Sequence, residues 1–247
     1  TPRAQHNDRM GTSNRLAQFE GHNFIELLEV DRPATMAPHD FNASPPFFSF
    51  GAHSKKFLET GNGMSALVLT GNDAREEVET FRRAGVDTYA PFDFERKATL
   101  PDGKQVTVGF SLAYATSPAM PRITFFTCHQ TAPQYFWKPE FQEHANGAQR
   151  IAAVYIVAEE PAAHRQFLEG LTGATAEDAT GGLRFSCRSE TLFVLTPDAV
   201  TGIDPSCQPD LGDGPCFAGI AIETDKAAPD LVPASEGLGI FIAWGRD

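Results

Sequence analysis

The chain has 247 residues, of which 41% are hydrophobic and 21% are charged, as is usual for a globular protein with a substantial core. It carries 20 Lys and Arg residues against 32 Asp and Glu residues, a formal net charge of −12, which disfavours binding to nucleic acid or to an anionic membrane. The longest apolar runs, such as residues 151–158, have the length of a strand and fall short of a membrane span. Nucleic acid and a membrane are therefore not expected as partners, whereas the site-forming side chains gathered in residues 124–148, among them Cys128, His129 and Trp137, predict a small-molecule pocket.

The first eight residues are polar and do not resemble a signal peptide. The four cysteines lack CxxC spacing, and a chain of this length does not need disulfides to fold. These observations predict reduced thiols and a cytoplasmic location. A bridge between Cys207 and Cys216 is left open.

In chain order, the first predicted elements are two strands at residues 14–19 and 24–30, joined by a turn at Glu20-Gly21. They look like the back half of a β-α-β-β-β module. The first strand and helix of that module would precede Thr1, so we expect about 25 to 35 residues to be missing there. The segment 33–51, rich in Pro, Ser and Phe, is predicted to be a long loop.

A complete module follows. Residues 64–71 form a predicted strand, and Asn72 or Asp73 can cap the next helix, in which apolar residues recur on one face until Gly85. A hairpin turn at Pro101-Asp-Gly103 precedes a strand whose apolar residues alternate between positions 106 and 112. Another strand covers residues 122–127.

The last part repeats this pattern 87 residues later, with a strand at 151–158 and a helix opened by Pro161. Further strands are predicted at residues 183–187, 191–195, 217–222 and 239–244, and a loop at 198–215. The sequence therefore predicts an α+β fold of repeated β-α-β-β-β modules. Residues 1–60 would hold the remainder of a first module and a long loop, 61–148 a second module and 149–247 a third.

Five motifs, spread over about residues 8–175, resemble the glyoxalase-like domain family of the vicinal oxygen chelate superfamily. They are Gly11-Thr-Ser-Asn-Arg-Leu, Phe24-Ile-Glu-Leu, Phe125-Phe-Thr-Cys-His-Gln, Phe136-Trp-Lys-Pro-Glu-Phe and His144-Ala-Asn-Gly-Ala. The resemblance implies modules that curl into open-barrel mixed sheets with helices outside. It also implies a divalent metal held by His and Glu side chains that face inward from the first and last strands.

Glu26 shares a predicted strand face with Phe24 and Leu28, where a carboxylate is costly unless it meets a cation or several donors. It resembles the glutamate ligand of the superfamily, and His129 ends a strand at the place where that superfamily delivers a ligand. We therefore predict that Glu26 and His129 are the catalytic and metal-binding residues, for Zn, Fe, Mn, Ni or Mg. The alternatives are an edge carboxylate that faces solvent and a loop histidine bonded to the backbone.

Six further residues are predicted to bind substrate: Asn14, Arg15, Phe126, Trp137, His144 and Asn146. Arg15 suits an anionic group, and the aromatic side chains suit an apolar wall. Asn-Gly is first of all a turn signal, so local structure is the alternative for Asn146. Cys128 precedes His129 directly, and neighbours on a strand point to opposite faces, so a thiol nucleophile with His129 as its base is disfavoured.

Two functions from different classes remain. The first is a metal-dependent lyase, isomerase or dioxygenase-type enzyme acting on a small oxygenated organic substrate. The second is a metal-free protein that binds or sequesters a small molecule, as in bleomycin resistance. The predicted strands 64–70 and 151–158 lack the histidine that extradiol dioxygenases place there, which favours the second, whereas Glu26 favours the first. Pairing of modules between chains would give a homodimer, and the sequence leaves the oligomeric state open.

Overall fold

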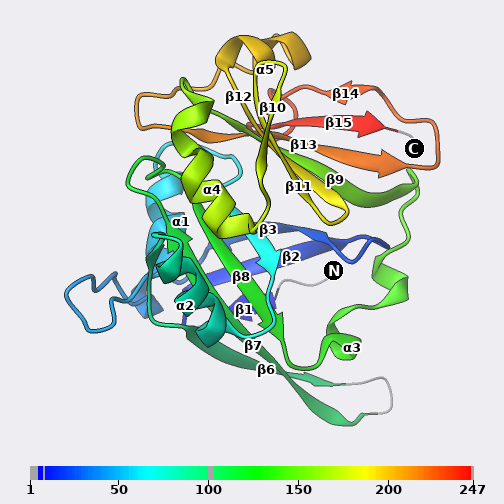
Figure 1. Cartoon of the computed structure of the whole chain (residues 1–247). Helices are drawn as coiled ribbons and strands as arrows, with labels where there is room; N and C mark the ends of the chain where they lie inside the picture. Colours follow the sequence, from blue (N-terminus) through cyan, green and yellow to red (C-terminus); the bar gives the residue numbers. More distant parts are fainter. Residues whose placement is uncertain (1–4, 8, 100–102, 246–247) are drawn as a thin grey trace.

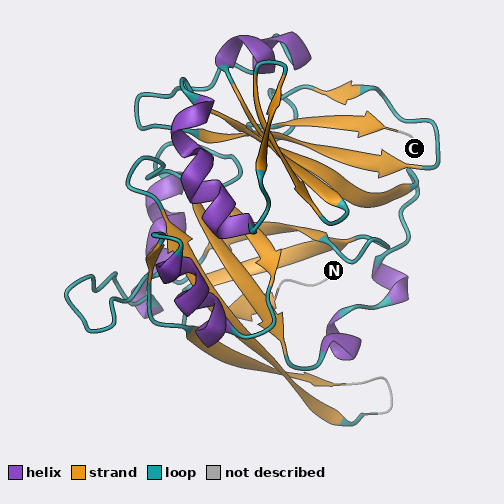
Figure 2. Cartoon of the chain, viewed as in Figure 1, coloured by secondary structure: helices purple, strands orange, loops and turns teal. Residues whose placement is uncertain are grey.

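The strands of the protein form three sheets. The computed structural model describes residues 5–7, 9–99 and 103–245, so Pro101 and Asp102 of the predicted hairpin turn lie outside the described residues. One sheet has three strands, one has five and one has seven (Figure 1). Helices lie around the strands (Figure 2), and the sheets are not closed into barrels. The predicted α+β class is confirmed.

The first sheet is an antiparallel meander in the order β1-β2-β3. Its strands are β1 (Gln5–Asn7), β2 (Thr12–Gln18) and β3 (Phe24–Val30). In the register of β2 and β3, Leu16 lies directly opposite Glu26 and Asn14 lies opposite Leu28. This register determines which side chains of the two strands share a face.

A single-turn 3-10 helix (Pro33–Thr35) and helix α1 (Phe50–Leu58) follow the first sheet. The prediction of a continuous loop over residues 33–51 is therefore wrong at both ends. Ser49 caps α1 by accepting a hydrogen bond from the backbone N–H of Ala52 at 3.2 Å. Gly51 lowers the helix propensity of this segment, so the sequence does not predict the helix. Glycine is required at this position because an added Cβ would lie 2.1 Å from the Met10 carbonyl oxygen.

The second sheet contains the complete β-α-β-β-β module. Its elements are β4 (Ala66–Thr70), α2 (Ala74–Arg83), β5 (Asp87–Thr88), β6 (Phe92–Thr99), β7 (Gln105–Thr116) and β8 (Thr124–Gln130). β4 runs parallel to β8, and β7 pairs antiparallel with β8, β6 and β5. Asp73, one of the two predicted caps, accepts hydrogen bonds from the backbone N–H groups of Arg75 and Glu76 at 2.8 and 3.2 Å.

A short helix α3 (Pro133–Phe136) and a 3-10 turn (Pro139–Phe141) lead into the seven-stranded sheet. That sheet begins with β9 (Ala148–Val157), a 3-10 turn (Pro161–His164), α4 (Arg165–Thr172), β10 (Ala176–Ala179), β11 (Gly182–Cys187) and β12 (Glu190–Leu195). β9 is parallel to β12, as β4 is to β8, so the predicted repeat is present in the topology.

Helix α5 (Pro197–Ile203) and three strands complete the sheet: β13 (Cys216–Thr224), β14 (Leu231–Val232) and β15 (Phe241–Gly245). α5 corrects the loop predicted over residues 198–215, because Thr196 caps it and Pro197 occupies its first turn. The strand order is β10-β11-β12-β9-β13-β15-β14, which places β9 between β12 and β13. Cys207 and Cys216 are buried and free, so the bridge left open by the sequence is not formed.

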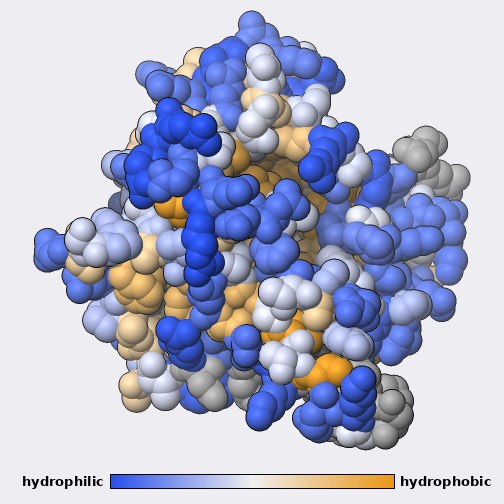
Figure 3. Space-filling view, turned by 60° about the horizontal axis from the view of Figure 1, so that its bottom comes forward, coloured by the Kyte–Doolittle hydropathy of each residue, from blue (hydrophilic) through white to orange (hydrophobic). Residues whose placement is uncertain are grey.

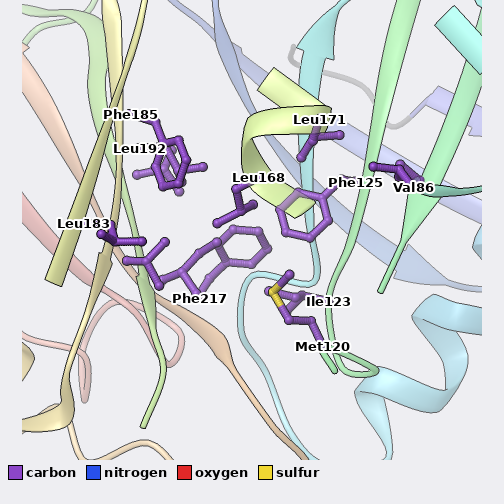
Figure 4. Close-up of a cluster of buried hydrophobic side chains, with 14 of the residues drawn as sticks. Val86, Met120, Ile123, Phe125, Leu168, Leu171, Leu183, Phe185, Leu192 and Phe217 are labelled. Carbon is purple, nitrogen blue, oxygen red and sulfur yellow. The ribbon is translucent and has the colours of Figure 1, made fainter. Parts of the chain in front are cut away.

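A hydrophobic core joins the two complete modules. Phe125 on β8 is fully buried and lies in one cluster with Leu168 on α4 and Phe217 on β13 (Figure 4). Its ring centroid is 5.4 Å from that of Phe167 on α4 and 5.9 Å from that of Phe217. An added Cβ at Gly170 of α4 would lie 2.9 Å from the Cβ of Ala84, so glycine allows this close approach. Within the described residues, no helix combines the length and hydrophobicity that crossing a membrane requires.

Candidate functional site

A cleft of about 60 Å³ lies between the first and the second sheet. One side is formed by side chains of β2 and β3, and the other by side chains of β4, β6, β7 and β8, with Phe50 of α1 and Phe136 of α3 at its border. On the face shown in Figure 3, hydrophobic surface lies recessed among hydrophilic residues. A concave, mainly apolar site with a few polar groups is typical of small-molecule binding.

Strand alternation carries the side chains of the first wall into the cleft. Phe24, Glu26 and Leu28 occupy alternate positions of β3, and all three line the cleft together with Asn14 and Leu16 of β2. The Asn14 side-chain nitrogen donates a hydrogen bond to Glu26 Oε1. Asn14 is itself 9% exposed, whereas Glu26 stays accessible to solvent where it faces the cleft. The first wall therefore presents a carboxylate that a neighbouring amide holds in place.

The opposite wall is aromatic and contains one cation. Arg96 of β6 lies with its guanidinium carbon 4.8 Å from the ring centroid of Phe110 and 5.7 Å from that of Phe94. The two rings are stacked with their centroids 4.8 Å apart. Because Phe94 and Phe110 are also paired across β6 and β7, the sheet itself fixes the platform on which Arg96 lies.

Cys128 and Gln130 of β8 complete this wall with polar groups. Burial and the negative charge of Glu26 raise the pKa of Cys128 to about 12, which keeps this thiol protonated near neutral pH. Burial also raises the pKa of Tyr114, whose hydroxyl has no hydrogen-bond partner among the described residues. Both groups therefore remain uncharged beside Glu26.

Glu26 and Arg96 are the charged groups of the cleft. The walls of the cleft desolvate the Glu26 carboxylate, which raises its pKa above its ordinary value, and the hydrogen bond from Asn14 and the charge of Arg96 act in the opposite direction. Burial likewise lowers the pKa of Arg96, which the charge of Glu26 partly offsets. A carboxyl group whose pKa is shifted by burial inside a cleft is a candidate for proton transfer or for specific hydrogen bonding.

The structure does not bring His129 to Glu26, which corrects the predicted pair. Phe126, Cys128 and Gln130 line the cleft from alternate positions of β8, so His129, which lies between two of them, faces the other side of the sheet. There it is paired across the strands with Ser111. Of the predicted residues, the cleft brings together Glu26, Asn14 and Phe126.

The other predicted substrate-binding residues lie outside the cleft lining. Arg15 is exposed and alternates with Asn14 on β2, so it points away. The ring of Trp137 stacks on His22 at 5.3 Å and contacts Phe136 edge-on at 5.0 Å, which places it behind the wall. Nε2 of His144 is hydrogen-bonded with the Gln18 carbonyl oxygen at 2.6 Å.

Asn146 stabilises a turn, which is the alternative to substrate binding that its Asn-Gly sequence suggested. Its side-chain oxygen accepts a hydrogen bond from the backbone N–H of Ala148 at 3.3 Å, and its carbonyl oxygen accepts one from the Thr224 hydroxyl at 2.9 Å. Gly147 follows with φ at +73°. The Asn-Gly pair therefore forms the turn into β9 and supplies nothing to the cleft.

The donor set of the cleft does not fit a divalent metal. Glu26 is the single carboxylate among the lining residues described, and no histidine joins it. Across the described part of the chain, no three His, Cys, Asp or Glu side chains gather in an arrangement that could hold a metal ion. His129 is on the opposite face of β8 from the cleft, so it does not stand beside Glu26 as the predicted facial arrangement requires.

Comparison with known proteins agrees with the fold. The sequence profile of the glyoxalase-like domain family matches residues 1–172, well over half of the chain, so this protein belongs to that family, part of the vicinal oxygen chelate superfamily. A comparison with curated protein sequences gives no match.

The crystal structure of a hypothetical protein from Staphylococcus aureus is similar with a TM-score of 0.70 and 13% identity, over 99% of this chain and 89% of that one. Identity this low indicates a shared fold and nothing about activity. A fusion protein described as xylose isomerase-like TIM barrel/4-hydroxyphenylpyruvate dioxygenase aligns over 89% of this chain and 33% of its own length, with 14% identity and a TM-score of 0.43. A TM-score of this size does not establish a common fold.

Arg96 is the main site residue that the sequence reasoning missed. A signal for it exists, because Phe92, Phe94 and Arg96 alternate with Asp93, Glu95 and Lys97 along β6. The arginine therefore shares the aromatic face of its strand and is separated from the charged face.

Proposed function

We propose that this protein binds a small organic molecule in the cleft between β2–β3 and β6–β8, without a metal ion, and that Glu26 is the polar anchor. The observation that carries the proposal is the carboxylate of Glu26 in a mainly apolar lining, where Asn14 donates a hydrogen bond to it and Arg96 lies near it. Apolar walls supply affinity, and a few placed polar groups supply orientation.

Binding is tested with phenol and fluorobenzene as probes, followed by NMR shifts of cleft residues. Leu28→Phe fills the cleft from β3 and is expected to weaken binding about tenfold or more. Leu27→Phe places the same ring on the opposite, exposed face of β3 and should leave binding unchanged.

The metal-free character is tested in the same titration. Affinity should be the same with and without EDTA. Binding that disappears in EDTA and returns with Zn²⁺ would overturn the metal-free proposal, and equal weakening by both phenylalanine variants would overturn the assignment to the cleft.

One observation favours a second function, proton transfer by Glu26. A carboxylate whose pKa is raised by burial is a better base near neutral pH, and Arg96 supplies positive charge close by. Glu26 would take a proton from a carbon next to a carbonyl group. The C–H electron pair becomes the C=C bond of an enolate, and the carbonyl electron pair moves to the oxygen, where Arg96 offsets its charge.

This second function is tested by proton exchange of dihydroxyacetone and pyruvate in D₂O, observed by ¹H NMR. The wild-type protein should accelerate the loss of the C–H signal, and Glu26→Gln should exchange at the rate of buffer alone. Equal rates for the two proteins would reject proton transfer and leave ligand binding standing.

A further inference from the structure

Asn14 has one polar atom that the protein leaves without a partner. Its side-chain nitrogen donates to Glu26, while its side-chain oxygen is buried and has no hydrogen-bond partner among the described residues. The residue is 9% exposed and lines the cleft. A buried amide oxygen without a donor is unfavourable, so a donor that reaches this atom from the cleft would stabilise it.

The hydrogen bond from Asn14 to Glu26 determines which atom of the Asn14 amide is left without a partner. A carboxylate only accepts hydrogen bonds, so it must face the NH₂ group of Asn14, and the oxygen of the same planar amide then points elsewhere. An amide oxygen in turn only accepts. The group that completes the site must therefore bring an O–H or N–H donor.

The surroundings restrict what else this molecule can be. Glu26 disfavours an anion and Arg96 disfavours a cation, so a neutral molecule fits best. The aromatic lining, which includes Phe24, Phe126 and Phe136, favours a planar apolar ring. The cleft is open to solvent, and its volume of about 60 Å³ is well below the roughly 150 Å³ of a cavity that holds a whole benzene ring, so only a small group and one ring edge enter it.

We propose that the cleft selects neutral aromatic hydroxyl or amino compounds, whose O–H or N–H group donates a hydrogen bond to the side-chain oxygen of Asn14. This inference rests on the proposed ligand-binding function of the cleft. It adds a specificity-determining residue and a ligand class.

Two isosteric pairs test it: phenol against fluorobenzene, and aniline against toluene. In each pair the shape is nearly constant and the donor is present in the first member alone. We expect the donor-bearing member to bind about tenfold tighter or more, because its partner leaves the Asn14 oxygen unpaired. Asn14→Leu should reduce this preference to about twofold or less while both members still bind.

Gln130→Leu removes the amide that β8 contributes to the cleft lining. If the preference is lost in Gln130→Leu, or persists in Asn14→Leu, the donor goes elsewhere and the assignment to Asn14 is overturned. Equal affinity of both members of each pair for the wild-type protein overturns the inference but leaves the proposed function intact. Absence of binding by all four probes overturns both.

A measurement on the wild-type protein covers the case in which Asn14→Leu does not fold. The side-chain NH₂ resonances of Asn14 should shift when phenol binds, since a donor on the oxygen polarises the amide, and should move much less with fluorobenzene. Equal shifts with both probes contradict the inference.

Discussion

Asn14 and Glu26 are diagonal neighbours across β2 and β3, and the amide of the first donates a hydrogen bond to the carboxylate of the second. The residue directly opposite Glu26 on β2 is Leu16, whose side chain cannot donate a hydrogen bond to the carboxylate. The pair couples two properties of the cleft: the protonation state of Glu26 and the hydrogen-bonding character of the amide beside it.

The preference for donor-bearing ligands should disappear at low pH. When Glu26 takes up a proton, its O–H can donate to Asn14 after the amide rotates, so the amide oxygen no longer awaits a ligand. Since the pKa of Glu26 is raised, the loss should begin above the ordinary range of a glutamate as the pH falls.

The groups that face Glu26 do not titrate in this range. Arg96 on β6 stays charged, and the raised pKa values of Cys128 on β8 and Tyr114 on β7 keep both neutral. The measurement is the affinity ratio of phenol to fluorobenzene as the pH is lowered from neutral, and a constant ratio would contradict the coupling.

Glu26 should also make the stability of the protein depend on pH. Its folded pKa is raised above the unfolded value of 4.5, so the folded state binds the proton more tightly. The resulting stabilisation is present below the unfolded pKa and is lost as the pH rises through the folded pKa. Urea unfolding should therefore show that Glu26→Gln gains stability relative to wild type as the pH rises. Glu29→Gln is the control variant. It is on the other face of β3 and measures how much stability changes when a glutamate outside the cleft is replaced by glutamine. Parallel curves for wild type and Glu26→Gln would contradict the expectation.

Cys128 should react slowly with iodoacetamide at neutral pH. With a pKa of about 12 only a minute fraction is thiolate, and the rate should rise about tenfold per pH unit until that pKa is approached. Mass spectrometry of the alkylated peptide measures the rate, and Cys128→Ala identifies the signal. Phenol should slow the reaction because Cys128 lines the cleft. Rapid alkylation at neutral pH would show that the thiol is less buried than the structure places it.

Phe125→Ala should destabilise the protein by about 3 to 5 kcal/mol, because the ring is fully buried between β8, α4 and β13. Phe41→Ala, at a ring that is 56% exposed, should cost much less. The free energies of unfolding in urea make the comparison. Similar losses for the two variants would contradict the role of Phe125 as the residue that joins the two modules.

Local patterns in the sequence predicted the features of the fold and the site that depend only on residues close together in the chain. Alternation along β3 was enough to place Glu26 on one face with Phe24 and Leu28, as the cleft lining shows. Asp73 was recognised as one of two caps because capping requires particular side chains just before a helix. Helix α1 was missed because Gly51 weakens its local propensity, and packing against Met10 outweighs that loss.

Local patterns could not predict which side chains of β8 face the cleft. Residues 124–127 are all buried, so the strand shows no alternation that would tell the side of Cys128 from the side of His129. Only the long-range register, which pairs Leu112 with Cys128, decides it. A shift of one residue in that register would have exchanged the two side chains.

The position of β9 has a consequence for where this protein can be divided. The family match ends at residue 172, yet both strands that pair with β9, namely β12 and β13, come later in the chain. A fragment cut at that boundary would expose both edges of an apolar strand, whose free N–H and C=O groups would recruit other chains and aggregate.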